Sequence, residues 1–402
     1  MQERLRDERY YGLDWLRIGA FALLILYHIG MFFVSWGWHV KTAEPQEWLE
    51  LPMLAVNPWR LSLLFVVSGI ASRILLARTE GAGRFARSRS ARLLVPLAAG
   101  MALFVAPQAW AELQEKAGYA HGFWHYWLHD YFIFGETEGV ITPTWNHLWF
   151  VVYLWAYTML LALLSCLPAG ARRRLQDAFD RLFAGPRVLL LPILLLWGAR
   201  MVLFPVFGET HALLDDPYAH IVYGFAFFFG VGLGRDSGLW GAIAAQGKAA
   251  GIVALAGYAA IVGLDLTIPG ESGDVELLVA RFARSLLAWG AIVALIGLAR
   301  RHLHRDNAAR RYLTEAIFPY YIAHQTIIVL AGHWLSPLRL GAAAEFAIIL
   351  PATVIGCALT FELGRRIAWL RPLIGLKPTP RRGAPSAAPS AKAPVLDPQA
   401  AP

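Results

Sequence analysis

Apolar runs long enough to cross a bilayer recur along this chain, and short polar connections separate them. A transmembrane helix needs about 20 predominantly apolar residues. The pattern therefore predicts an all-α fold, a polytopic membrane helix bundle of about ten transmembrane helices. We expect the spans at residues 13–36, 58–77, 93–110, 147–167, 187–205, 217–234, 249–265, 278–299, 315–335 and 343–370.

Two features of the chain ends refine this prediction. The first apolar run is too long for a signal peptide, and it contains Arg17 and His28. From Lys377 onward the sequence is rich in Pro, Ala and Ser. We expect one integral-membrane domain, residues 1–376, followed by a disordered cytoplasmic tail, residues 377–402.

Composition and charge agree with a lipid environment. The chain is 57% hydrophobic and 16% charged, whereas a soluble domain carries about 25% charged residues. The net charge of +8 has a topological origin. The N-terminus, the even-numbered connections and the segment from Arg365 hold 27 of the 36 Lys and Arg residues, and the odd-numbered connections hold Lys41, Lys116 and Arg339. The positive-inside rule then predicts that both termini are cytoplasmic, and no nucleic-acid partner is expected.

The first span contains ionisable residues, which are rare in hydrocarbon because each charge costs about 3 kcal/mol at mid-span. Arg17 and His28 are eleven positions apart. On an α-helix their side chains therefore point within about 20° of each other, about 16 Å apart along the axis. Asp14 is expected to form an interfacial ion pair with Arg17. His28 follows Leu23 to Leu26, where a structural hydrogen bond and a functional role are both open.

Five short motifs resemble those of acyltransferase family 3, the bacterial integral-membrane acyltransferases. The resemblance extends over the membrane part of the chain, and the last two motifs resemble the subgroup that contains glucans biosynthesis protein C. The motifs are Leu13-Asp14-Trp15-Leu16-Arg17 followed by His28, Phe65-Val66-Val67-Ser68-Gly69, Arg89-Ser90-Ala91-Arg92 ahead of Pro96, His147-Leu148-Trp149-Phe150 and Tyr320-Tyr321-Ile322-Ala323-His324-Gln325.

The resemblance implies an O-acyltransferase of the bacterial inner (cytoplasmic) membrane. Such an enzyme would move an acyl group, acetyl or succinyl, from a cytoplasmic acyl-CoA-type donor to a hydroxyl of a periplasmic or cell-surface glycan. The expected partners are acyl-CoA, the glycan acceptor and the lipid bilayer. No bound cofactor and no metal are expected.

Acyl transfer to a hydroxyl requires a base for the hydroxyl proton, a place for the donor and stabilisation of the oxyanion. His28 is the expected base because imidazole titrates near neutrality, and an acyl-histidine is the alternative. Arg17 is expected to steer the donor toward His28. Arg89 and Arg92 are expected to bind the donor phosphates, with ordinary positive-inside charge as the alternative. Candidate acceptor-side or supporting groups are Ser68, Asn146, His147 and His324.

The outer connection, residues 111–146, is rich in aromatic residues. Anchoring at the membrane interface is the favoured interpretation for most of them, and sugar stacking stays open. His121, His125 and His129 are spaced to share a helical face, but acidic ligands at matching spacing are lacking beyond Asp130, so a metal site is not favoured.

Two other functional classes compete with the enzyme. A secondary transporter would use the intramembrane Arg and His residues as a substrate or proton site. A membrane scaffold or sensor without chemistry gains nothing specific from these residues. We favour the acyltransferase because the motifs occur in order along the membrane part of the chain.

Overall fold

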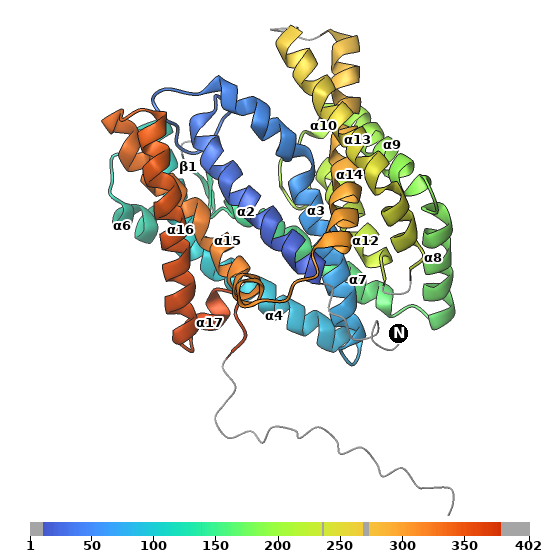
Figure 1. The fold of residues 1–402 in the computed structure, drawn as a ribbon. Helices are drawn as coiled ribbons and strands as arrows, with labels where there is room; N and C mark the ends of the chain where they lie inside the picture. Colours follow the sequence, from blue (N-terminus) through green and yellow to red (C-terminus); the bar gives the residue numbers. More distant parts are fainter. Residues whose placement is uncertain (1–10, 138, 235–236, 268–272, 379–402) are drawn as a thin grey trace, which may run out of the picture.

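The structure, a computed structural model, describes residues 11–137, 139–234, 237–267 and 273–378, and it is a bundle of α-helices (Figure 1). The predicted all-α class is confirmed. The helices of eight or more residues are α2 (Tyr11–Phe33), α3 (Glu50–Ala77), α4 (Ala82–Gly100), α5 (Ala106–Ala117), α7 (Trp149–Ser165), α8 (Ala169–Leu182), α9 (Arg187–Val202), α12 (Phe225–Gly232), α13 (Leu239–Thr267), α14 (Asp274–His302), α15 (Ala308–Leu335) and α16 (Ala342–Arg366).

Short elements join these helices. β1 (Gly135–Thr137) and β2 (Val140–Thr142) form an antiparallel pair in the connection between α5 and α7. The short α-helices are α6 (Phe123–His125), α10 (Phe204–Phe207), α11 (Pro217–Ala219) and α17 (Leu370–Leu373). The 3₁₀ turns are η1 (Glu47–Leu49), η4 (Asn146–Leu148) and η6 (Ser336–Leu338), and the π-helical turns are η2 (Met101–Val105), η3 (Tyr126–Asp130) and η5 (His220–Gly224).

Among the described residues, seven helices are long and apolar enough to cross a membrane, and up to eight if α8 and α9, which meet at 93°, count as one span. The predicted span at 217–234 falls on the short elements α11, η5 and α12. The predicted span at 315–335 falls on α15, which carries polar His324, Gln325 and Thr326 near its middle. The chain is thus a multi-pass membrane protein, and the number of ten spans stays a prediction.

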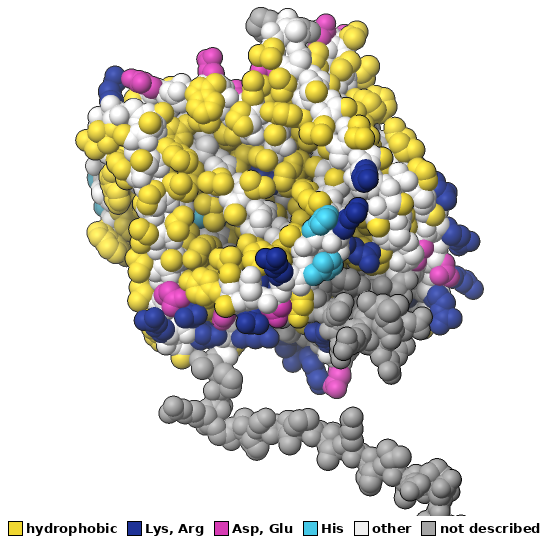
Figure 2. Space-filling view, in the orientation of Figure 1, with side chains coloured by type: hydrophobic (Ala, Val, Ile, Leu, Met, Phe, Trp, Pro, Cys, Tyr) yellow, Lys and Arg dark blue, Asp and Glu magenta, His cyan; other side chains and the backbone are white. Residues whose placement is uncertain are grey.

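The surface has an apolar middle and a basic end. Figure 2 shows hydrophobic side chains over most of the visible face, with Lys and Arg gathered toward its lower part. In Figure 1 the first residues of α2, helix α17 and the obliquely placed α4 all lie toward that lower end. By the positive-inside rule this basic end is the one expected to face the cytoplasm. Apart from Lys377 and Pro378, the predicted tail lies outside the described residues.

Two glycines let α3 and α12 pack with their backbones in contact. A methyl group on Gly69 would lie 2.0 Å from the carbonyl oxygen of Phe227, and one on Gly230 would lie 2.0 Å from that of Val66. Small residues at helix interfaces permit such close approach in membrane proteins. The glycine of the Ser68-Gly69 motif therefore has a packing role.

The ion pair predicted for Asp14 has a different main partner. Arg310 of α15, which is 2% exposed, donates to Asp14 across the helix interface and also donates to Asp306 at 2.8 Å. Asn307 caps α15 by accepting from the backbone N–H of Arg310. The prediction of an Asp14–Arg17 contact pair missed this because Arg310 is distant in sequence. Arg310 ties α2 to α15 and leaves the Arg17 guanidinium without an ion pair among the described residues.

Candidate active site

A polar cavity of ≈ 510 Å³ lies inside the bundle and is the candidate active site. Residues of α2, α3, α7 and α15 form its inner wall, and three connections complete it on the side of Trp38, Trp145 and His211. Its polar and aromatic lining residues are Tyr27, His28, Trp38, His39, Arg60, Thr144, Trp145, Asn146, His147, Trp149, Phe150, Thr210, His211, Tyr321 and Gln325.

Hydrogen bonds fix the tautomer of His28. His324 Nδ1 lies 2.7 Å from the carbonyl oxygen of Tyr321, to which it donates, so the neutral ring has an accepting Nε2. His28 Nδ1 lies 2.8 Å from that Nε2 and therefore donates to it. The two rings are nearly parallel, with an angle of 5° between their planes. The lone pair of His28 is consequently on Nε2, the atom that a base or nucleophile uses.

His147 holds the helix that carries His324. Its Nε2 donates to the carbonyl oxygens of Tyr321 (3.1 Å) and Ile322 (3.2 Å), and the Tyr321 hydroxyl donates to the His147 carbonyl. The ring centres of His147 and His324 are 5.2 Å apart. His147 Nδ1 is buried without a hydrogen-bond partner. His147 thus orients α15, and its Nδ1 is enclosed beside the cavity without a hydrogen-bond partner.

His39 also lines the cavity, and the sequence analysis did not single it out. Its Nδ1 donates to Glu112 Oε2 at 2.5 Å, and its Nε2 lies 2.9 Å from Gln325 Nε2. Gln325 also donates to Gln108 Oε1, as does Asn146, at 3.1 and 3.3 Å. This network places the predicted residue Asn146 at the cavity. Two consecutive residues of α15 therefore bond to two histidines of the cavity: His324 to His28, and Gln325 to His39.

Arg60 and Glu209 bring charge close to the cavity. The Arg60 guanidinium carbon lies 3.4 Å from the centre of the Tyr27 ring, a cation–π contact. Glu209 accepts from the Tyr223 hydroxyl at 2.5 Å and from His211 Nε2 at 3.1 Å. Burial acts to raise the pKa of Glu209, but the hydrogen bond and the charge of His211 outweigh it and hold that pKa below its ordinary value. Glu209 is therefore ionised at neutral pH.

The three arginines predicted to bind the donor gather at the basic end of the bundle. Arg17 and Arg92 both act electrostatically on Arg89, whose Nε is buried without a hydrogen-bond partner. Arg89 and Arg92 lie within α4, not in the connection where they were predicted, because α4 begins at Ala82. No residue of this cluster is among those that line the polar cavity. Between the two places, Phe21 packs edge-to-face against Tyr321 at 5.7 Å.

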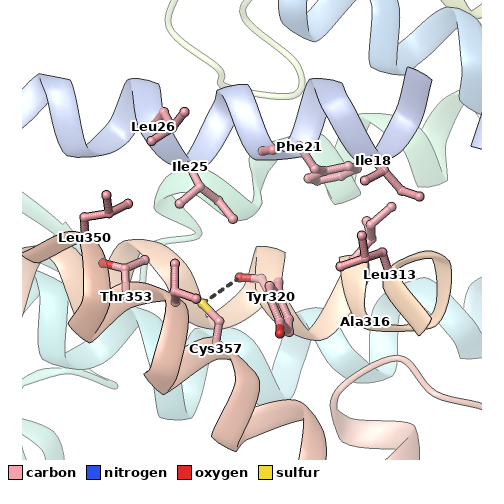
Figure 3. Close-up of a pocket in the computed structure, with 13 residues that line it drawn as sticks. Ile18, Phe21, Ile25, Leu26, Leu313, Ala316, Tyr320, Leu350, Thr353 and Cys357 are labelled. Atoms are coloured by element: carbon pink, nitrogen blue, oxygen red, sulfur yellow. Dashed lines mark hydrogen bonds between the residues drawn. The ribbon is translucent and has the colours of Figure 1, made fainter. Parts of the chain in front are cut away.

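The opposite face of α2 borders an apolar pocket of ≈ 310 Å³ between α2, α15 and α16 (Figure 3). Ile18, Ile25 and Leu26 point into it from α2, and Tyr320 and Cys357 face each other across from them. The lining offers no charged side chain. His28 therefore belongs to the polar cavity, and the pocket is apolar space on the other side of α2.

A family model described as an acyltransferase domain matches residues 10–362. The chain belongs to acyltransferase family 3. The predicted family and the predicted class of enzyme, an acyltransferase, are confirmed at this level. The match covers every residue that we named as a candidate site residue from the sequence.

Two curated relatives that match this chain share one name. Glucans biosynthesis protein C from Escherichia coli O6:K15:H31 (strain 536 / UPEC) and the protein of that name from Escherichia coli O1:K1 / APEC are each 31% identical to this chain over 153 residues. The aligned part is 38% of this chain and 38% of each relative, so the chain spans little more than a third of the curated proteins it matches. No solved structure matches the chain.

The structure divides the predicted residues of this acyltransferase family 3 member into two groups. His28, His147 and Asn146 line the polar cavity, and the buried His324 bonds to His28. The arginines gather at the basic end. Ser68 is half-buried on α3 and is not among the cavity-lining residues.

Residues 111–146, the connection predicted to lie outside, pack against the bundle. The rings of His121 and His125 stack with centres 4.2 Å apart, and those of His125 and His129 lie 4.8 Å apart. Within the described residues no group of three His, Cys, Asp or Glu side chains is placed to hold a metal ion. Tyr126 and Tyr131 are fully buried, whereas Trp145 lines the cavity. Most of these aromatics therefore have packing roles.

Proposed function

We propose that this protein is an integral-membrane O-acyltransferase of the bacterial inner membrane. It moves an acetyl or succinyl group from a cytoplasmic acyl-CoA-type donor to a hydroxyl of a periplasmic or cell-surface glycan. The observation that carries the proposal is the His28–His324 pair, which leaves a basic lone pair on His28 Nε2 inside a polar cavity. Membership in acyltransferase family 3 supports the class of reaction.

The proposed reaction uses His28 as base. His28 Nε2 takes the proton of the acceptor hydroxyl, and the hydroxyl oxygen attacks the thioester carbonyl carbon. The carbon–sulfur bond of the resulting tetrahedral intermediate then breaks, and the leaving thiolate receives the proton from His28. The hydrogen bond from His28 Nδ1 to His324 keeps the ring oriented through both transfers.

The proposed acceptor is a glycan because of the lining of the cavity. Trp38 and Trp145 offer aromatic faces of the kind that pack against sugar rings, and Thr144 and Asn146 offer hydroxyl and amide groups for hydrogen bonds. The name of the relatives, glucans biosynthesis protein C, agrees with this class of acceptor.

The proposal is tested by comparing cells with and without the chain. Periplasmic glucans and surface polysaccharides are isolated, and their ester-linked acyl groups are measured by mass spectrometry. We expect one ester type to disappear with the chain and to return when the gene is restored. Identical ester profiles in both strains, with the protein present in the membrane of the first, would reject the proposed function.

The arginine cluster gives a prediction about the donor. Arg89→Gln removes one phosphate-binding guanidinium, so the KM for acyl-CoA is expected to rise about tenfold, the cost of one charge-assisted hydrogen bond. Arg84→Gln on the same helix is the matched control, because Arg84 is exposed and pairs with Glu80. Steady-state kinetics in detergent measure both. Acyl-pantetheine, which lacks the nucleotide phosphates, should be equally good for wild type and Arg89→Gln, and equal KM values for acyl-CoA in all three proteins would contradict the role of Arg89.

A further inference from the structure

Arg60 is a buried cation at the wall of the cavity, and it forms no ion pair. Its side chain belongs to α3, it is 5% exposed, and it lines the same cavity as His28. Within the described part of the chain, no carboxylate oxygen approaches the guanidinium closely enough to pair with it. A buried charge without a partner is costly, so a site of this kind calls for a bound counter-charge.

The donors of Arg60 are only partly used. Its two hydrogen bonds to Asn57 come from Nη1, which donates to the carbonyl oxygen of Asn57 at 3.0 Å and to Asn57 Oδ1 at 2.8 Å. Its Nε is buried and has no hydrogen-bond partner. The ring of Tyr27 covers one face of the guanidinium. Asn57 and Tyr27 therefore hold the guanidinium, while no other described residue offers an acceptor to its Nε.

Glu209 does not pair with Arg60. Its charge acts on Arg60, but its carboxylate accepts hydrogen bonds from Tyr223 and His211. Glu209 thus lowers the cost of keeping Arg60 charged without accepting a hydrogen bond from it. A molecule that enters the cavity can therefore supply an anionic acceptor to Arg60.

We propose that Arg60, held by Tyr27 and Asn57, forms a subsite that binds a carboxylate group of a substrate. A guanidinium binds a carboxylate through two parallel hydrogen bonds, which suits a planar group with free N–H donors. The inference rests on the proposed acyl transfer and names one chemical group of its substrates. That carboxylate has two sources, the far end of a dicarboxylic acyl group or an acidic sugar of the acceptor.

The position of the subsite fits both sources. The ring centres of Tyr27 and His28 are 6.2 Å apart, and Arg60 stacks on Tyr27 at 3.4 Å. The guanidinium therefore lies within about one short acyl chain or one sugar ring of the reacting centre. An acyl carboxylate would be bound throughout the transfer, whereas an acceptor carboxylate would be bound only when that acceptor is present.

The test uses pairs of substrates that differ in one carboxylate. Succinyl-CoA is compared with butyryl-CoA, which has the same chain length and ends in a methyl group. A glucose oligosaccharide is compared with one that contains glucuronic acid. The full-length protein is assayed in lipid nanodiscs as wild type, Arg60→Gln and Arg60→Lys, with His129→Gln as an exposed histidine control.

Wild type is expected to prefer the carboxylate-bearing member of one pair, and that pair identifies the source. Arg60→Gln should lower kcat/KM for that member by about 10²–10³-fold and change the neutral member by less than fivefold, because truncating one side of a buried charge pair has effects of that size. Arg60→Lys should recover part of the preference, since it keeps the charge and loses the fork.

Three outcomes would overturn the subsite. Equal kcat/KM values of wild type for both members of both pairs would do so without any variant, even if Arg60→Gln failed to fold. Equal losses for charged and neutral members in folded Arg60→Gln would assign Arg60 to structure or to the oxyanion instead. Unchanged kinetics in Arg60→Gln would remove it from binding altogether. Failure of the proposed function looks different, because wild type would then transfer no acyl group from either donor.

Discussion

His28→Ala is expected to lower kcat for acyl transfer by about 10³-fold while leaving the protein folded and abundant in the membrane. The hydrogen bond from His28 Nδ1 to His324 leaves the lone pair of His28 on Nε2, where it can accept the hydroxyl proton. General-base catalysis of this kind typically contributes 10²–10⁴-fold to the rate. The side chain lines the polar cavity, so its truncation enlarges that cavity and leaves the apolar core intact, although His324 Nε2 loses its donor. The measurement is transfer of a radiolabelled acyl group to a glucan by purified protein.

Substitutions of His324, the hydrogen-bond partner of His28, test how far the activity depends on that hydrogen bond. His324→Gln offers an amide oxygen that can accept from His28 Nδ1 and should keep much of the activity, whereas His324→Leu offers no acceptor and should lose about tenfold or more. Activity of His28→Ala within a few-fold of wild type would remove His28 as the base. Equal effects of Gln and Leu at position 324 would show that the hydrogen bond does not set the tautomer.

Gly69→Ala and Gly230→Ala are each expected to prevent stable assembly of the bundle. In both cases the new methyl carbon would lie 2.0 Å from a carbonyl oxygen of the facing helix, and backbone cannot swing aside as a side chain can. Separation of α3 from α12 should cost at least about 3 kcal/mol, the upper range for overpacking. The measurement is the amount of monodisperse protein in mild detergent, together with its thermal unfolding temperature.

Gly198 provides the matched control for these two substitutions. It lies on α9, and a methyl group there meets no atom within 4 Å. Gly198→Ala should be neutral or slightly stabilising because alanine favours helix. If Gly69→Ala unfolds at the wild-type temperature, the close packing of α3 on α12 is wrong. A loss of stability in Gly198→Ala of the same size would point to a general intolerance of the bundle.

Several features of the fold and the site follow from the local spacing of apolar and charged residues in the sequence. The eleven-residue spacing of Arg17 and His28 places both on one face of α2, because that helix runs without a break from Tyr11 to Phe33. Apolar runs of about 20 residues identified most of the long helices. The predicted span at 187–205 falls on α9, Arg187–Val202, after a bend of 93° at the Gly185-Pro186 break. The span at 217–234 proved harder, because the structure divides it among α11, η5 and the short α12, and the apolar pattern does not mark those divisions.

Other features of the site depend on pairs that lie far apart in the chain. His39 and Glu112, and likewise Asp14 and Arg310, are brought together only by tertiary structure. Arg60 carried a usable signal, since a charge within a predicted span marks function or a buried partner. The sequence could not show that Arg60 has no ion-pair partner among the described residues. That became visible only when the structure placed its neighbours.

The contact between Phe21 and Tyr321 has a consequence for the energy supply of the cell. Phe21 lies on α2 between Arg17 and His28, and Tyr321 lines the polar cavity. A continuous water path from the arginine cluster to the cavity would let protons and ions cross the bilayer. Moving one elementary charge through 100 mV releases about 2.3 kcal/mol, so such a leak would dissipate the membrane potential at each opening. A protein that joins a substrate on each side of a membrane must therefore admit the donor without ever opening both sides to water together. The Phe21–Tyr321 contact places two aromatic side chains where such a path would run along α2 between Arg17 and His28.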